Sequence, residues 1–106
     1  MAIKPAEVNI IGKRYTIEYV DRPSDVDILH RTSLWGQIDP WTRTIRILDN
    51  GRGAQDLLHT LLHEVLHGII SEMNMCENTV DDEATVDILA LALADVLTRN
   101  GWLRDG

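Results

Sequence analysis

Three things are scarce in this sequence: cysteine, positive charge and long apolar runs. Cys76 is the only cysteine among 106 residues, so no intramolecular disulfide can form, and we interpret its thiol as an ordinary core or surface group. Acidic residues or histidines interrupt every apolar stretch well before the ~20 residues that a membrane-spanning helix needs. The opening residues, MAIKPAEVNI, lack the apolar segment of a secretory signal. We therefore expect a cytoplasmic protein with no membrane contact.

The shortage of basic residues also bears on partners. Ten Lys and Arg against 17 Asp and Glu give a formal net charge of −7. Nucleic acids and anionic membranes both select for basic patches, and no cluster of aromatic and basic side chains is present. We interpret Trp35, Trp41 and Trp102 as core or interface residues, and we expect no nucleic-acid partner.

The remaining composition is that of one globular domain. Apolar residues make up 44% of the chain and charged residues 25%, which is typical of a folded protein. A chain of 106 residues can build one core but not two, so we predict a single domain over residues 1–106.

Short β-rich segments occupy the first half of the sequence. Residues 7–20 (EVNIIGKRYTIEYV) predict a hairpin around a Gly-Lys-Arg turn. Residues 33–39 (SLWGQID) and 43–49 (RTIRILD) predict a second pair of strands. In the last segment isoleucine alternates with arginine, which indicates a half-buried strand. Between the two pairs we expect a loop with a turn of helix at Ser24.

Two long helices are predicted in the second half. The first runs from about residue 54 to residue 75, and the second from about residue 80 to residue 98 with Asn78 or Thr79 as its N-cap. Strands followed by helices predict an α+β fold, in which an antiparallel or mixed sheet packs on two long C-terminal helices. We expect the two helices to pack on each other through Leu61, Leu62, Val65, Leu66, Leu89 and Leu93.

The first of these helices contains an H-E-x-x-H pattern, HEVLH, at residues 63–67. His63 and His67 lie one turn apart on the same face, so both imidazoles can reach one metal ion. Glu64 projects beside them, where its carboxylate can accept a proton from metal-bound water. The alternative is an amphipathic helix whose histidines make ordinary hydrogen bonds, but an idle Glu64 among leucines would be costly to bury. The pattern therefore predicts a zinc site.

Zinc in an enzyme needs a third protein ligand and one position left open for water. Glu83 and Asp87 are four residues apart on the second helix and share a face that is otherwise apolar. We predict Glu83 as the ligand and Asp87 as the residue that orients a ligand histidine, although the sequence leaves the choice between the two open. We interpret Asp81 and Asp82 as acidic residues that favour the helix N-terminus.

Two histidines remain outside this set. His59 lies one turn before His63, and three histidines at this spacing spread about 12 Å along the helix axis. We therefore place His59 at the edge of the core or beside a ligand, and not on the metal. We interpret His30 as a loop residue; the alternative is that it faces the site and polarises a carbonyl group.

The HEVLH motif followed by an acidic residue on the next helix resembles the gluzincin arrangement of zincin metallopeptidases. Glu83 and Asp87 follow His67 by 16 and 20 residues and are similar to the glutamate ligand and its acidic companion in that arrangement. The pattern LLHEVLHGI…LALALADVL is most similar to small phage or prophage zincin-like proteins related to ImmA/IrrE-type and SprT-like metallopeptidases. This likeness covers residues 57–93, and the N-terminal half shares only the placement of strands before the motif helix.

The resemblance implies a zinc endopeptidase with a peptide or protein substrate. In that interpretation His63, His67 and Glu83 bind zinc, and Glu64 is the general base for a zinc-activated water that attacks the peptide carbonyl. An extended peptide would add to an edge strand, either SLWGQID or RTIRILD. Larger gluzincins carry a further subdomain that supplies a residue to stabilise the oxyanion. The candidates for that role in this chain are Tyr15, Tyr19, His30 and Arg46.

Two other functions are compatible with these residues. One is a non-catalytic interaction module in which a bound zinc ion ties the two helices together. The other is a metal-dependent hydrolase of a non-peptide substrate, including RNA. Glu64 favours the enzyme, because a structural zinc site has no use for a base and usually closes its fourth position. The sequence indicates neither the identity of the substrate nor the oligomeric state.

Overall fold

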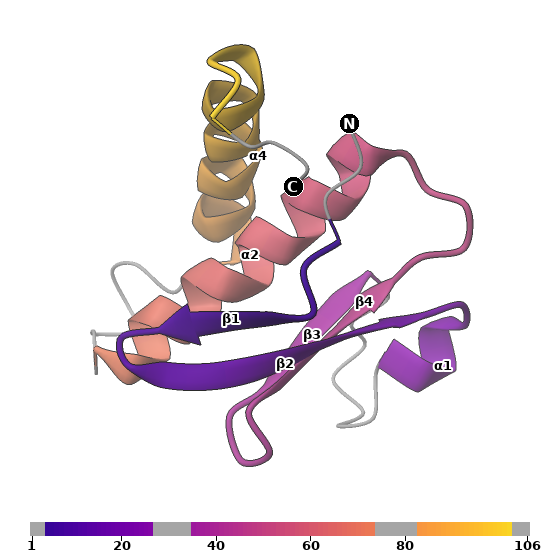
Figure 1. Cartoon of the computed structure of the whole chain (residues 1–106), viewed down its shortest axis with the longest axis vertical. Coiled ribbons are helices and arrows are strands. Elements are labelled where there is room, and N and C mark those ends of the chain that lie inside the picture. The colour runs from indigo at the N-terminus through magenta and orange to yellow at the C-terminus, as the bar shows by residue number, and fades with distance from the viewer. Residues whose placement is uncertain (1–3, 27–34, 74–82, 103–106) are drawn as a thin grey trace.

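The structure, a computed structural model, describes residues 4–26, 35–73 and 83–102. In these ranges a four-stranded mixed sheet is combined with two long helices (Figure 1), so the predicted α+β fold with its mixed sheet is confirmed. No helix among the described residues is both long enough and apolar enough to cross a membrane. Several residues that were interpreted from the sequence lie outside the described ranges: His30, Cys76, Asn78, Thr79, Asp81 and Asp82.

The first two strands form the predicted hairpin. β1 (Glu7–Ile10) pairs antiparallel with β2 (Lys13–Val20) through a turn at Ile11 and Gly12, whose φ angles are 49° and 81°. Two successive positive φ angles match the twist of a tight hairpin and favour glycine at the second position. The Gly12 amide donates to Asn9 Oδ1 at 2.8 Å, which closes the turn. The turn lies earlier than the predicted Gly-Lys-Arg segment because the lysine and the arginine already belong to β2.

The other two strands complete the sheet in the order β1-β2-β4-β3. β3 (Gly36–Asp39) pairs antiparallel with β4 (Thr44–Leu48), and β4 pairs parallel with β2 after the single helical turn α1 (Pro23–Val26). β4 is therefore an interior strand. The expectation that RTIRILD could be an edge strand is wrong, because β4 has a neighbour on each side. Within the described residues β3 is an edge strand, as proposed for SLWGQID.

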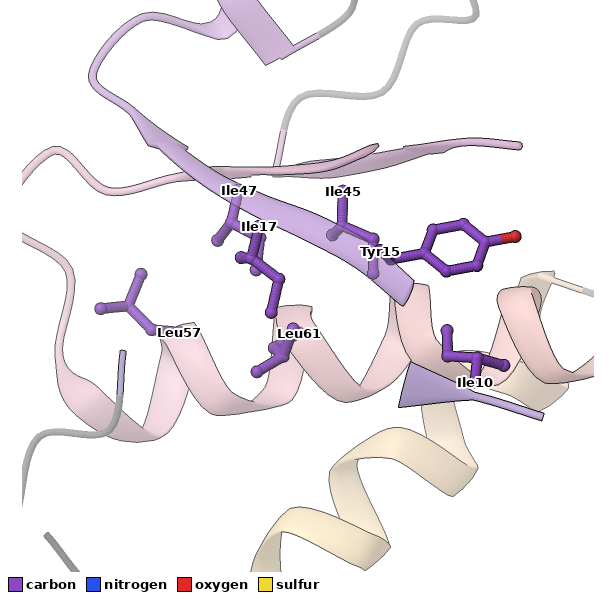
Figure 2. Close-up of a cluster of buried hydrophobic side chains, with 7 residues drawn as sticks. All are labelled: Ile10, Tyr15, Ile17, Ile45, Ile47, Leu57 and Leu61. Carbon is purple, nitrogen blue, oxygen red and sulfur yellow. The ribbon is translucent and has the colours of Figure 1, made fainter. Parts of the chain in front are cut away.

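The core lies between the sheet and α2 (Ala54–Glu72). Ile45 and Ile47 are fully buried, whereas Arg46 between them points to the other face of the sheet, as the alternation of β4 predicts. Burial of each such side chain contributes roughly 1.5–3 kcal/mol to folding. The buried cluster comprises Ile10, Tyr15, Ile17, Ile45, Ile47, Leu57 and Leu61 (Figure 2).

The last helix, α4 (Glu83–Arg99), packs against α2 and stands away from the sheet (Figure 1). Its buried side chains are Val86, Ala90 and Ala94, spaced four residues apart along one stripe. Leu89 and Leu93, which the sequence predicts in this contact, are 53% and 38% exposed. Small side chains occupy the contact stripe, and the larger leucines lie outside it.

Candidate metal centre

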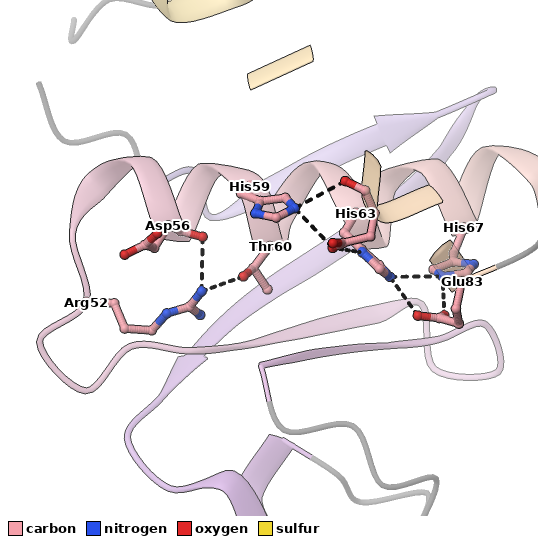
Figure 3. A network of polar contacts seen from close by, with 8 residues as sticks. Arg52, Asp56, His59, Thr60, His63, His67 and Glu83 are labelled. Carbon is pink, nitrogen blue, oxygen red and sulfur yellow. Dashed lines mark hydrogen bonds and ion pairs between the residues drawn. The ribbon is translucent and has the colours of Figure 1, made fainter. Parts of the chain in front are cut away.

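Three histidines on one face of α2 point toward α4, because residues four apart in a helix lie above one another (Figure 3). His63 and His67 are both partly buried, and their Nε2 atoms lie 3.2 Å apart. Their ring centroids are 4.9 Å apart with a tilt of 52°. Two imidazole nitrogens thus converge on the same small volume beside α4.

Glu83, the first residue of α4, supplies the third donor. Its Oε2 lies 3.1 Å from His63 Nε2, and its Oε1 lies 2.6 Å from His67 Nε2. One donor atom from each of the three residues lies within 4.8 Å of the others, so this group could hold a metal ion. These are the residues that the sequence predicts as metal ligands. We call them the donor group.

The spacing of the donor group suits a small divalent cation. Ligands about 2.0–2.2 Å from a tetrahedral ion lie about 3.3–3.6 Å from one another. The observed separations of 2.6, 3.1 and 3.2 Å are slightly shorter, so the donor atoms need only move apart by less than about 1 Å. Two nitrogens and one carboxylate oxygen are a donor set that zinc accepts. The Glu83 side chain is 75% exposed, which leaves one side of the group open to solvent.

Asp87 lies one turn beyond Glu83 on α4 and contacts Nδ1 of His63, the ring nitrogen that does not belong to the donor group. Its Oδ1 is 3.1 Å from His63 Nδ1, which favours a proton on Nδ1 and leaves the lone pair on Nε2, the nitrogen in the donor group. The same oxygen lies 3.0 Å from His59 Nε2. Asp87 therefore lies between His59 and His63 and contacts both of them.

Glu64 is buried against the edge strand, with only 7% of its surface exposed. The backbone amide of Ile38 in β3 donates to its carboxylate. Burial raises the pKa of Glu64 to about 7, and the nearby charges of His63 and His67 offset part of that rise. A carboxyl group with this pKa exchanges a proton near neutral pH.

The close approach of Glu64 to β3 depends on Gly36. A Cβ atom at this position would lie 2.7 Å from Thr60 Cγ2 and 3.2 Å from Glu64 Oε2, so a side chain there would force α2 away from the strand. The role of Gly36 was not inferred from the sequence. Its signal is an isolated glycine inside a strand pattern, which often marks a close backbone approach.

Arg52 is a second residue that the sequence did not single out. Its guanidinium donates to Leu48 O at 3.0 Å and to Thr60 Oγ1 at 2.7 Å, and it lies 4.6 Å from the ring of Trp35. These contacts tie the first turns of α2 to β4 and to the start of β3. They fix the helix at the level where Glu64 meets the edge strand. No motif marks Arg52 in the sequence.

The candidates for oxyanion stabilisation make contacts elsewhere. The Tyr15 hydroxyl donates to Glu72 Oε2 at 2.7 Å, and the Tyr19 hydroxyl donates to Pro5 O at 3.0 Å. Arg46 lies on the sheet face opposite α2, with its Nε 3.3 Å from Glu18 Oε1. His30 lies outside the described residues. We therefore assign the role of oxyanion stabilisation to none of the three described candidates.

The chain was compared with protein-family models, with curated proteins and with solved structures, and none of the three comparisons found a match. The chemistry of the site must therefore be argued from its own geometry.

Proposed function

We propose that this chain is a zinc-dependent endopeptidase of the zincin type. The observation that carries the proposal is the buried carboxyl group of Glu64, with a pKa of about 7, next in sequence to the donor group. Strongly shifted pKa values gather at catalytic sites, where an acid–base group must match the working pH. A site that served only to hold a metal would gain nothing from burying a fourth ionisable group at this cost.

The residues divide into holding and proton-transfer roles. His63, His67 and Glu83 would hold the ion, and Asp87 would keep His63 in the tautomer that binds metal. Zinc bound there would supply Lewis-acid activation of a water molecule and of the substrate carbonyl. Glu64 would take the proton that the attacking water loses and deliver it to the nitrogen of the leaving amine.

The edge strand supplies a route for the substrate. An extended peptide can pair with the open edge of a sheet through main-chain hydrogen bonds. β3 lies at such an edge among the described residues, and Glu64 contacts it at Ile38. A peptide aligned with β3 would therefore pass close to the proposed base, which favours a peptide over other substrates.

One observation favours the alternative of a metal-bound interaction module. The donor group joins α2 to α4, whose buried side chains Val86, Ala90 and Ala94 offer only a narrow apolar contact. A metal at this position would stabilise the helix pair whether or not the site is catalytic. The two functions make different predictions for Glu64.

The test compares zinc-loaded wild-type protein with the Glu64→Gln variant on an unfolded protein substrate. The variant keeps the donor group, so we expect equal zinc content and a hydrolysis rate lower by about a hundredfold to ten-thousandfold. Asp56→Asn is the matched control, because it removes an exposed carboxylate from the first turn of α2 and should retain full activity. Equal turnover by wild type and Glu64→Gln would exclude Glu64 from the chemistry. No hydrolysis by zinc-loaded wild type would favour the interaction module.

A further inference from the structure

α4 carries a second apolar face away from its buried stripe of Val86, Ala90 and Ala94. The residues that share it are exposed: Ile88 by 66%, Leu89 by 53%, Val96 by 43% and Leu93 by 38%, with Ala92 exposed among them. We call these five residues the outer face of α4. At 3.6 residues per turn the outer face is centred well over 90° around the axis from the buried stripe at Ala90.

The outer face is apolar although it is exposed to solvent. A helix that exposes one face to water normally carries polar residues there, whereas α4 is apolar on both sides. From the exposed fractions, the outer face presents about 400 Å² of apolar surface, within the size range of patches that are often functional.

We propose that the outer face of α4 is a self-association surface, on which a second copy of this chain docks its own α4 in antiparallel orientation about a two-fold axis. This inference is independent of the proposed peptidase activity. Glu83 and Asp87 contact the α2 histidines from the other side of α4, so the pairing would leave the donor group uncovered.

The charge pattern of α4 favours a second copy of the chain as the partner and an antiparallel orientation of the two helices. Residues 88–94 (ILALALA) carry no charge, although the chain as a whole has a formal net charge of −7. This uncharged middle is a place where two acidic copies can meet with little repulsion. The N-terminal half of α4 is acidic through Glu83 and Asp87, whereas its C-terminal half has no net charge because Asp95 pairs with Arg99 at 2.7 Å. Antiparallel pairing therefore keeps the two acidic ends apart and also aligns the helix dipoles favourably.

The spacing of the outer face suits helix pairing. Leu89, Ala92 and Val96 follow one another at intervals of three and four residues, which is the spacing of the seam between paired helices. Ala92 lies near the middle of the seam, and its small side chain lets two helix backbones approach closely. Two-fold symmetry is the commonest arrangement for self-association, because one patch then serves both partners.

The available area sets the expected strength. Two outer faces would bury about 800 Å² in total, at the small end of the range for interfaces between proteins. We therefore expect a reversible dimer that dissociates on dilution through the micromolar range.

Sedimentation velocity over a concentration series tests the proposal with a matched pair of variants. Leu89 and Leu91 are each 53% exposed, but they lie about 160° apart around the helix axis. Leu89→Glu should be monomeric at every concentration, whereas Leu91→Glu should dimerise as the wild type does. Circular dichroism should show unchanged helix content in both variants. A wild type that is monomeric throughout, or equal loss of dimer in both variants, would overturn the proposal.

A mixing experiment tests the two-fold symmetry. Ala92 lies near the middle of the seam, so antiparallel copies place position 92 of one chain close to position 92 of the other. Ala92→Glu and Ala92→Lys should each be monomeric alone and should form a heterodimer when mixed. A mixture that stays monomeric would contradict the antiparallel arrangement.

A vesicle experiment tests a different occupant of the outer face. If the wild type does not dimerise but co-sediments with neutral phosphatidylcholine vesicles, and Leu89→Glu abolishes that binding, the outer face is a lipid-binding surface and self-association is overturned.

Discussion

At the residue scale, the motif and its surroundings differ in how readily they are inferred. His63, Glu64 and His67 follow from a local pattern, since helix periodicity alone places the two histidines on one face. Gly36 and Arg52 act across the gap between α2 and the sheet, and only the folded structure places them there. Local spacing predicts which side chains can share a helix face, but not which strand will approach them.

The burial of Glu64 predicts a pH dependence of stability in the protein freed of metal by a chelator. Its pKa rises to about 7 from a usual value of 4.5, so the folded protein holds this proton more tightly than the unfolded chain does. The stabilisation is complete below about pH 4.5 and is lost as the pH rises through about 7. Over that pH range the wild type should lose on the order of 3 kcal/mol in its free energy of unfolding. The Glu64→Gln variant has no carboxyl group at this position and should not show that loss. Urea unfolding of both chains at several pH values measures the difference, and parallel curves would contradict it.

Gly36 gives a prediction that concerns packing. Gly36→Ala places a methyl group 2.7 Å from Thr60 Cγ2, so we expect a loss of about 1–3 kcal/mol in the free energy of unfolding. Gly53→Ala is the control, because its nearest neighbour would lie at 3.8 Å, an ordinary contact. Adding Thr60→Ser to Gly36→Ala removes the clashing methyl group while keeping the hydroxyl that Arg52 donates to, and should restore part of the stability. Equal denaturant midpoints for the two alanine variants would mean that β3 tolerates a side chain there.

At the scale of elements, periodicity predicts the helices and the first hairpin, but not how the elements pair. The parallel contact of β2 with β4 joins residues more than 20 apart in sequence, and nothing local to RTIRILD distinguishes an interior strand from an edge strand. The face through which α4 contacts α2 is likewise not predicted by local sequence. Leu89 and Leu93 are the more hydrophobic residues, yet Ala90 and Ala94 are buried. Apolar character on both sides of a helix leaves the choice of face undetermined.

Because the apolar contact between α4 and α2 is narrow, we expect a bound metal to stabilise α4 more than it stabilises α2. α2 packs on the sheet through large side chains, whereas the attachment of α4 consists of Val86, two alanines, the donor group and polar contacts of Asp87 and Thr98 with α2. We expect a chelator to lower the melting temperature while most helical circular dichroism remains, and to speed amide hydrogen exchange in residues 83–99 far more than in residues 54–72. Zinc should restore the protection. Complete loss of helix on chelation would show that the metal also holds α2 in place.

At the scale of the whole molecule, the order of strands and helices predicts the α+β class, and the HEVLH motif predicts where a site would lie. The sequence could not distinguish Glu83 from Asp87 as the third ligand, because both lie on the same face of one helix. The crossing of α2 and α4 makes the distinction: it brings Glu83 to both Nε2 atoms and Asp87 to the Nδ1 of His63. A rigid-body relation between two helices has no signature in the spacing of either one.

The central claim is that His63, His67 and Glu83 form one zinc site, and the zinc content per folded chain at equilibrium tests it most directly. We predict one zinc ion per wild-type chain, loss of stoichiometric binding in Glu83→Gln, and retention in His59→Ala, whose imidazole contacts Asp87 and not the donor group. Circular dichroism on each variant confirms that the chains compared are folded. Retention of zinc by Glu83→Gln together with its loss in His59→Ala would contradict the assignment.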